Sequence, residues 1–157
     1  MTAPNHVTGG IVFTGLFCSF FSVNIFANPV FVGVTIFGSL LPDIDHTKSW
    51  IGKAFYPIAK WLSVNYGHRT ITHSIFFLFG IYIISLFIEK NFSTDFSISC
   101  ILFFSVLSHL IFDMVTLQGI PLLYPFYKNP CVLPANPEMR IRSCLLYTSD
   151  AADERSS

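Results

Sequence analysis

Long apolar runs separated by short polar clusters make up most of the 157-residue chain. The first run covers about residues 9–41 and is interrupted at Asn24 and at Asn28-Pro29, where proline disfavours helix at the residue before it. This pattern predicts a helical hairpin, with a single kinked span as the alternative. The second arm, residues 30–41, would rise about 18 Å, less than the roughly 30 Å hydrocarbon core, so we expect it to be re-entrant, tilted or part-spanning.

Two further apolar runs, residues 74–88 and 96–117, are long enough for membrane spans or near-spans. Between the hairpin and these runs, residues 50–66 have apolar side chains at helical spacing, interspersed lysines and several aromatic residues. This composition predicts a helix lying in the membrane interface. Residues 120–137, rich in proline and aromatic residues, indicate an irregular stretch at the membrane surface.

The pattern therefore predicts an all-α membrane protein. Its elements would be about four hydrophobic helices, formed by a short N-terminal hairpin and two further spans, plus an interfacial amphipathic helix. The composition agrees, because 52% of residues are hydrophobic, 11% are charged and the mean hydropathy is +0.60. Such values are unusual for a soluble domain of this length.

The composition changes abruptly near the carboxy terminus. We expect residues 1–143 to form a single membrane-embedded domain. The last fourteen residues, 144–157, resemble translated sequencing-adapter DNA, so we expect a non-native tail that truncates a longer protein. An ordinary polar tail is the alternative.

The distribution of basic residues indicates the topology. If the hairpin returns to its starting side, the amino terminus, the loop 42–74 and the carboxy-terminal region share one face. That face then carries seven basic residues, and the opposite face carries only Lys90. Because cytoplasmic flanks of membrane proteins collect Lys and Arg, the first face is predicted to be cytoplasmic.

The same arrangement brings the polar clusters of the chain to one face. These clusters contain all five histidines and three of the nine carboxylates: His6; Asp43, Asp45 and His46; His68 and His73; His109 and Asp113. An ionisable group at the centre of a membrane helix costs roughly 2.5 to 3.5 kcal/mol, so such groups normally have a function. Imidazoles mixed with carboxylates favour Zn or Mn at a hydrolytic site.

The spacing within the clusters bears on metal binding. His109 and Asp113 are four residues apart and so lie on one face of a helix. His68 and His73, five apart, would diverge by about 140° on a regular helix. They converge only if the helix starts between them, with Thr70 or Thr72 as its N-cap.

The two aspartates of the second cluster follow Leu41-Pro42. We expect Asp43 and Asp45 to leave an extended turn on the same side, and His46 to point elsewhere as a ligand or as a partner of one.

Each cluster also has a structural explanation. His6 alone suits a solvated residue near the terminus, and the aspartates of the second cluster suit a helix stop and cap. His68 and Arg69 suit contacts with lipid headgroups. The pair His109 and Asp113 is the hardest to explain without a function, because both lie inside an apolar run.

In their order along the chain, the polar motifs resemble those of a known family. They are residues 40–46 (LLPDIDH), residues 67–74 (GHRTITHS) and His109-xxx-Asp113 with residues 116–119 and 123–126, preceded by His6 and Gly10. They are similar to the YdjM-like family of membrane-bound, metal-dependent hydrolases, over residues 3–128. The resemblance implies a multi-pass protein of the bacterial inner membrane, linked in some members to the LexA-controlled SOS response.

The resemblance implies the site residues as well. The family's motif positions fall on His6, Asp43, Asp45, His46, His68, His73, His109 and Asp113. We expect most of them to bind one or two divalent ions, Zn or Mn, that activate water. The expected ligands are His6, Asp43, His46, His68, His73, His109 and Asp113.

Two residues are expected to act in catalysis. Asp45, with Asp43 as the alternative, would be a general base or would orient a ligating imidazole. Arg69 suits a phosphate oxygen, which favours a phosphoester substrate over a peptide. The expected partners are the lipid bilayer and either a phospholipid or a soluble phosphoester. We expect no nucleic acid, and the sequence does not indicate an oligomeric state.

Other functions are less well supported. The chain has no HExxH motif and no GxSxG elbow, which disfavours a zincin protease and a Ser-His-Asp hydrolase. The competing hypothesis is a non-enzymatic membrane protein with a structural metal site or a role in ion or solute transport. A transporter would place polar residues near the midplane on several helices, whereas only His109 and Asp113 lie within a run here.

Overall fold

The structure is a computed structural model that describes residues 3–67, 69–92, 97–116, 118–126 and 131. Its helices, in chain order, are α1 (Ala3–Ser19), α2 (Pro29–Leu40), the 3-10 helix η1 (Leu41–Asp45), α3 (Trp50–Ala54), α4 (Tyr56–Tyr66), the 3-10 helix η2 (Ile71–His73), α5 (Ile75–Phe92) and α6 (Ser97–Met114). The described residues contain no β-strand, only an isolated bridge between Ile120 and Cys131. The predicted all-α class is confirmed. The tail 144–157 lies outside the described residues, so its interpretation stays a prediction.

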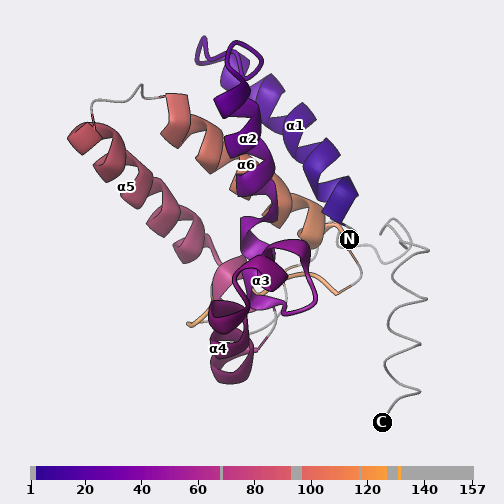
Figure 1. Cartoon of the computed structure of the whole chain (residues 1–157). Coiled ribbons are helices and arrows are strands. Elements are labelled where there is room, and N and C mark those ends of the chain that lie inside the picture. The colour runs from indigo at the N-terminus through magenta and orange to yellow at the C-terminus, as the bar shows by residue number, and fades with distance from the viewer. Residues whose placement is uncertain (1–2, 68, 93–96, 117, 127–130, 132–157) are drawn as a thin grey trace.

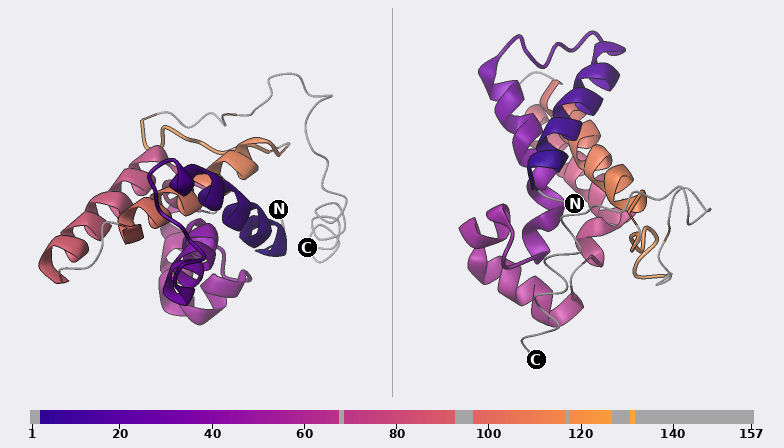
Figure 2. Two further views of the ribbon diagram at one scale, coloured as in Figure 1. Left: turned by 90° about the horizontal axis from the view of Figure 1, so that it is seen from above. Right: turned by 90° about the vertical axis from the view of Figure 1, so that its right-hand side faces the viewer.

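Helix α6 lies at the centre of the bundle and contacts α1, α2 and α5 (Figure 1). Helices α1 and α2 form the predicted hairpin, and Figure 1 and the left view of Figure 2 show α5 on the side of α6 away from α1. The hairpin turns where the sequence indicated. Asn28 caps α2 by accepting a hydrogen bond from the Val30 amide at 2.9 Å, and Pro29 occupies the first turn.

Helices α1, α2 and α6 pack closely on one another through small residues. A Cβ at Gly10 would lie 1.9 Å from Ser39 Oγ, and one at Gly38 would lie 2.0 Å from Ser105 Oγ. Only glycine fits at these crossings. Small residues let helix backbones approach in this way in membrane proteins, where lipid offers no hydrophobic drive for association.

The interior of the bundle contains many polar side chains beside two apolar clusters, and much of its surface is apolar. Fully buried residues include Thr14, Thr35, Ser39, Ser105 and Ser108. Large apolar side chains point outward instead, for example Leu16 on α1, Phe37 on α2, and Ile83 and Phe87 on α5, which are 45 to 69% exposed. Apolar surface of this extent is unfavourable in water and suits contact with lipid.

One helix among the described residues, α6, is both long and apolar enough to cross a membrane, and 56% of it is buried within the protein. The prediction of about four spanning helices is therefore not confirmed. The hairpin helices are shorter, with 17 residues in α1 and 12 in α2. At 1.5 Å per residue, α2 rises about 18 Å.

The predicted interfacial helix over residues 50–66 is wrong in one respect, because the structure has two helices there. Helix α3 ends at Ala54 and α4 begins at Tyr56, with Phe55 outside both. The break arises because Pro57 has no amide hydrogen and its ring would clash with the carbonyl four residues earlier. Aromatic side chains of this segment are exposed, among them Trp50 (76%) and Trp61 (57%).

Candidate metal centre

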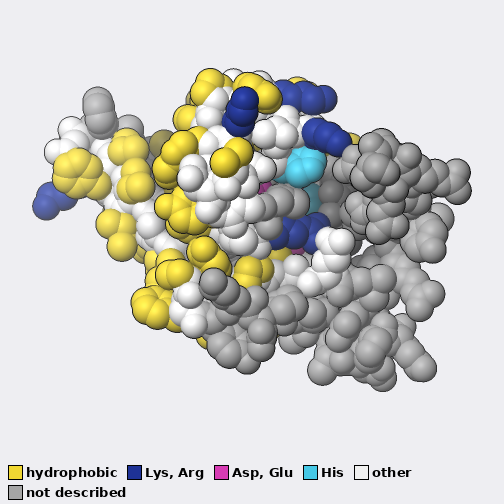
Figure 3. All heavy atoms as spheres, turned by 90° about the horizontal axis from the view of Figure 1, so that it is seen from below, with side chains coloured by type: hydrophobic (Ala, Val, Ile, Leu, Met, Phe, Trp, Pro, Cys, Tyr) yellow, Lys and Arg dark blue, Asp and Glu magenta, His cyan; other side chains and the backbone are white. Residues whose placement is uncertain are grey.

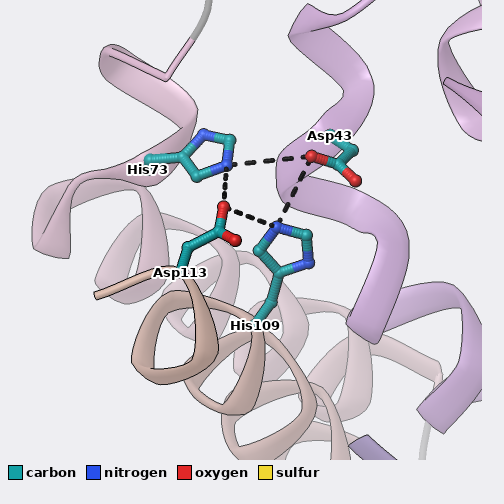
Figure 4. A group of neighbouring side chains, drawn as sticks. All are labelled: Asp43, His73, His109 and Asp113. Atoms are coloured by element: carbon teal, nitrogen blue, oxygen red, sulfur yellow. Dashed lines mark ion pairs between the residues drawn. The ribbon is translucent and has the colours of Figure 1, made fainter. Parts of the chain in front are cut away.

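Four side chains converge where η1, η2 and the end of α6 meet. They are Asp43 from η1, His73 from η2, and His109 and Asp113 from α6, and Figure 4 shows them pointing toward one another. One ligand atom from each lies within 4.8 Å of the other three. The two imidazoles and Asp113 are buried, while Asp43 is 19% exposed. We call this set the four-residue group.

The separations within the four-residue group suit a shared cation better than hydrogen bonds. Asp113 Oδ2 lies 3.3 Å from His73 Nε2 and 3.6 Å from His109 Nε2. Asp43 Oδ1 lies 3.5 Å from His109 Nε2 and 3.8 Å from His73 Nε2. An N–H···O bond is usually about 2.9 Å long. Two ligands about 2.0 to 2.2 Å from a tetrahedral ion are about 3.3 to 3.6 Å apart, which matches most of these distances.

Neighbouring groups present the Nε2 atom of each imidazole to this space. His109 Nδ1 lies 2.6 Å from the Ser39 carbonyl oxygen, which can only accept, so Nδ1 carries a proton. Thr72 donates its hydroxyl proton to Asp45 at 2.7 Å and therefore accepts from His73 Nδ1 at 3.1 Å. In the neutral form of either ring, Nε2 then offers its lone pair, as in metal-binding histidines. Among the residues that the structure describes, none makes a hydrogen bond with the buried Nε2 of His109.

Asp45 lies outside the four-residue group, next to the Nδ1 side of the His73 ring. Its Oδ2 accepts from the Arg69 amide at 2.9 Å and from the Thr72 hydroxyl, and it lies 3.7 Å from His73 Nδ1. The expected extended turn at Asp43 and Asp45 is instead the 3-10 helix η1, in which residues two apart point in different directions. The two carboxylates consequently face opposite nitrogens of the His73 ring, and the position of Asp45 suits orienting that ring.

Arg69 borders the four-residue group in an unusual conformation. Its φ of 59° lies in the left-handed region that non-glycine residues rarely occupy. The bond from its amide to Asp45 holds it there, and one guanidinium nitrogen donates to Gln118 at 2.7 Å. The other terminal nitrogen lies 3.7 Å from Asp113 Oδ2. A positive charge therefore stands beside the group.

The charges of the group compensate one another. Burial alone would raise the pKa of Asp43, but the neighbouring imidazoles of His109, His73 and His6 outweigh it and lower that pKa to about 2. Burial would lower the pKa of His73, but Asp113 and Asp45 outweigh it and raise it above the usual value. Both shifts reflect attraction between imidazoles and carboxylates in the group, and a divalent cation satisfies the carboxylates in place of imidazole protons.

The remaining predicted ligands have different positions. His6 is buried on α1, its Nε2 lies 3.5 Å from Asp113 Oδ1, and its ring stacks on that of His109 with centroids 3.9 Å apart. His46 ends η1 and is partly exposed, outside the four-residue group. His68 lies outside the described residues.

A helix does start between His68 and His73, but it is the short 3-10 helix η2, with Thr70 at its N-cap position and no hydrogen bond from a capping side chain. Helix α5 begins later and is capped by Ser74, whose hydroxyl accepts from the Phe77 amide at 3.2 Å. Thr72 cannot cap because its hydroxyl holds Asp45.

Sequence reasoning missed three supporting groups. Thr72 was considered only as a cap, and Gln118 only as part of a motif. The Ser39 carbonyl that holds His109 has no signal in the sequence, because every residue has a carbonyl. A conserved polar partner of a ligand can be searched for, but a backbone partner appears only in the fold.

An all-helical chain with large exposed apolar side chains, polar side chains within its bundle and a buried His/Asp group at one end is a membrane protein with a candidate metal centre. Comparison with known proteins then identifies the family. The family model described as YdjM inner membrane protein matches residues 1–150, and the chain belongs to this family. Membership places it among proteins of the bacterial inner membrane and confirms the resemblance of the polar motifs.

The alignments with three relatives cover more than half of each chain. Protein YvsG of Bacillus subtilis is 38% identical over 80% of this chain and 74% of the relative. Inner membrane protein YdjM of Escherichia coli is 31% identical over 85% of this chain and 72% of the relative. Inner membrane protein YbcI of the same species is 32% identical over 62% of this chain and 53% of the relative. No solved structure is significantly similar to the chain.

Proposed function

We propose that the protein is a membrane-bound, metal-dependent hydrolase that cleaves a phosphoester at the cytoplasmic surface of the inner membrane. The observation that carries this proposal is the four-residue group, in which two carboxylates and two imidazoles present ligand atoms within 4.8 Å of one another. Ionisable groups buried at a membrane helix are kept there for function as a rule.

The four-residue group would hold a divalent ion, and its donors are those of Zn and Mn sites. A bound ion supplies Lewis-acid chemistry, because it acidifies water and polarises a phosphoryl oxygen. The chain's own residues do the rest. Ser39 and Thr72 fix the imidazoles, and Asp45 orients His73 through their close contact at 3.7 Å.

Arg69 is the residue that favours a phosphoester. Its guanidinium is always charged and lies 3.7 Å from Asp113, where it can bind a phosphate oxygen beside the ion. The strained backbone at φ 59° and the bond to Gln118 hold it in that place. The peptide bond that a protease cleaves is uncharged and has no comparable anionic group.

The cytoplasmic location and the multi-pass topology are part of the proposal. The N-terminal end of α1, η1, α3, α4, η2 and the end of α6 lie at the same end of the bundle (Figure 1). Figure 3 shows Lys and Arg side chains on this face around exposed parts of His and Asp side chains. The described basic residues there are Lys48, Lys53, Lys60 and Arg69, as the positive-inside rule requires of a cytoplasmic face. Basic surroundings also attract an anionic substrate or lipid headgroup.

A structural metal site is the second candidate function, and one observation favours it. Four protein ligands would complete the coordination of a tetrahedral ion, and closed sites of that kind are structural. A six-coordinate ion such as Mn²⁺ would keep open positions for water and substrate. The two candidates therefore differ in whether the loaded protein turns over a substrate.

Hydrolysis of bis-p-nitrophenyl phosphate by the detergent-purified, metal-loaded protein tests the proposal. We expect activity in the wild type, its loss in His73→Ala and Asp113→Ala, and its retention in Glu89→Gln. Glu89 is a matched control because it is also a buried carboxylate, and it lies at the end of α5 far from the four-residue group. There it accepts a hydrogen bond from the Ser99 amide of α6. Metal binding without hydrolysis of this or a phospholipid substrate would favour the structural candidate.

A further inference from the structure

The two oxygens of the Asp113 carboxylate face different sets of imidazoles. Its Oδ2 is directed to His73 and His109, within the four-residue group. Its Oδ1 lies 3.5 Å from His6 Nε2, on α1. A carboxylate that presents one oxygen to each of two ligand sets has the arrangement of a bridging ligand in a two-metal site.

The ring of His6 is buried and packs against the ring of a ligand, His109. The His6 ring is 1% exposed and stacks on His109 with an interplanar angle of 13°. Its separation from Asp113 matches the ligand-to-ligand distance within the four-residue group rather than a hydrogen bond. Its Nδ1 is buried and has no hydrogen-bond partner among the described residues, so the polar contact of the ring is the one between Nε2 and Asp113 Oδ1.

His6 does not fit as a fifth ligand of the same ion. Two atoms that bind one ion at about 2.0 to 2.2 Å are at most about 4.4 Å apart. The set of ligand atoms that lie within 4.8 Å of one another consists of Asp43, His73, His109 and Asp113, without His6. The contact of His6 with the far oxygen of Asp113 therefore belongs to a neighbouring position.

We propose that His6 and Asp113 Oδ1 bind a second divalent cation, with the Asp113 carboxylate bridging it to the ion of the four-residue group. This rests on the proposed function, because it presumes the first ion. Two protein ligands leave most of the coordination of the second ion to water or to phosphate oxygens, as is usual for ions that bind together with phosphate groups. The second site is consequently weaker than the first and is completed by an anionic phosphate or phosphonate group.

Mn²⁺ binding to the full-length chain in detergent tests the proposal, with phenylphosphonate as a phosphoester analogue that is not hydrolysed. Free Mn²⁺ is counted by its electron paramagnetic resonance signal during the titration. We expect two ions per chain in the wild type, one in His6→Asn and two in His6→Asp, whose carboxylate replaces the imidazole. Ions that share a carboxylate are also magnetically coupled, so a low-temperature coupled signal should be present in the wild type and absent in His6→Asn.

Thr14→Val is the matched control for packing of α1. Thr14 is fully buried two turns beyond His6, and no described residue makes a hydrogen bond with its hydroxyl, so the isosteric change should leave both ions in place. One ion in the wild type, or two coupled ions in His6→Asn, would overturn the second site while the first stands. If His6→Asn binds no ion, the coupled signal is the test: its presence in both the wild type and His6→Asp supports the second site, and its absence from the wild type overturns it. No bound Mn²⁺ in the wild type would overturn the proposed function itself.

Discussion

Replacing Gly10 with alanine should destabilise the bundle and weaken metal binding together. Gly10 is the crossing point of α1 with α2, and an added Cβ would lie 1.9 Å from Ser39 Oγ and 2.8 Å from Ser39 Cβ. Ordinary contact begins at 3.4 Å, so the hydroxyl is about 1.5 Å too close (3.4 − 1.9). Turning the Ser39 side chain away relieves only the first of these clashes.

The cost has two parts. Ser39 Oγ donates to the Thr35 carbonyl at 2.7 Å, and losing that bond costs about 1 kcal/mol. The remaining clash between the two Cβ atoms forces α1 and α2 apart, which costs about 1 to 3 kcal/mol. A total of about 2 to 4 kcal/mol corresponds to a lower melting temperature by roughly 5 to 15 °C for a chain of this size.

The same displacement reaches the metal centre. The Ser39 carbonyl holds His109 Nδ1 at 2.6 Å, so moving α2 turns the imidazole away from the four-residue group. Loss of such a supporting bond usually weakens metal binding about 10- to 100-fold. We therefore expect a lower melting temperature and a higher metal Kd in the same variant.

Thermal unfolding in detergent and a metal-competition titration measure both effects. Gly33→Ala is the control, because Gly33 lies on α2 with nothing within 4 Å of an added Cβ. It should leave both quantities unchanged or slightly raise stability. The double variant Gly10→Ala/Ser39→Gly should recover part of the loss. A Gly10→Ala protein that melts and binds metal like Gly33→Ala would refute the reasoning.

Three further outcomes are expected. Asp45→Asn removes the charge behind His73 and should raise the metal Kd about 10- to 100-fold in the competition titration; an unchanged Kd would contradict its orienting role. Arg69→Lys removes the planar guanidinium and should raise KM for the phosphodiester about tenfold without loss of metal, whereas an unchanged KM would exclude it from substrate binding. Ser74→Ala removes the cap of α5 and should lower the free energy of unfolding by about 1 kcal/mol in a thermal unfolding experiment. Thr70→Ala is the control and should cost less, because the Thr70 hydroxyl bonds the Gly67 carbonyl within the loop. A larger loss in Thr70→Ala would contradict the cap assignment.

Sequence reasoning predicted the elements whose signals are local. Asn28-Pro29 marks the turn of the hairpin because its side chain and ring both favour a helix start. His109 and Asp113 lie together because four residues are about one helical turn. The meeting of distant clusters at one end of the bundle followed from the hairpin, because the turn between its two helices returns the chain to the side where it began.

The features that could not be predicted depend on tertiary packing. The different roles of Asp43 and Asp45 arise from the 3-10 geometry of η1, which the motif does not specify. Helix α5 begins after Ser74 because residues 71–73 form the separate 3-10 helix η2, in which the Thr72 hydroxyl bonds Asp45. His6 alone suits a solvated residue, and only the packing of α1 on α6 brings it to Asp113.

The metal content of the full-length, detergent-purified protein tests the central claim most directly. Inductively coupled plasma mass spectrometry should find at least one Zn or Mn per chain in the wild type and in Glu89→Gln. Asp113→Asn should retain less than a tenth of that content, because Asp113 contacts both imidazoles of the four-residue group. A wild type that carries no more metal than Asp113→Asn would contradict the assignment of a metal centre.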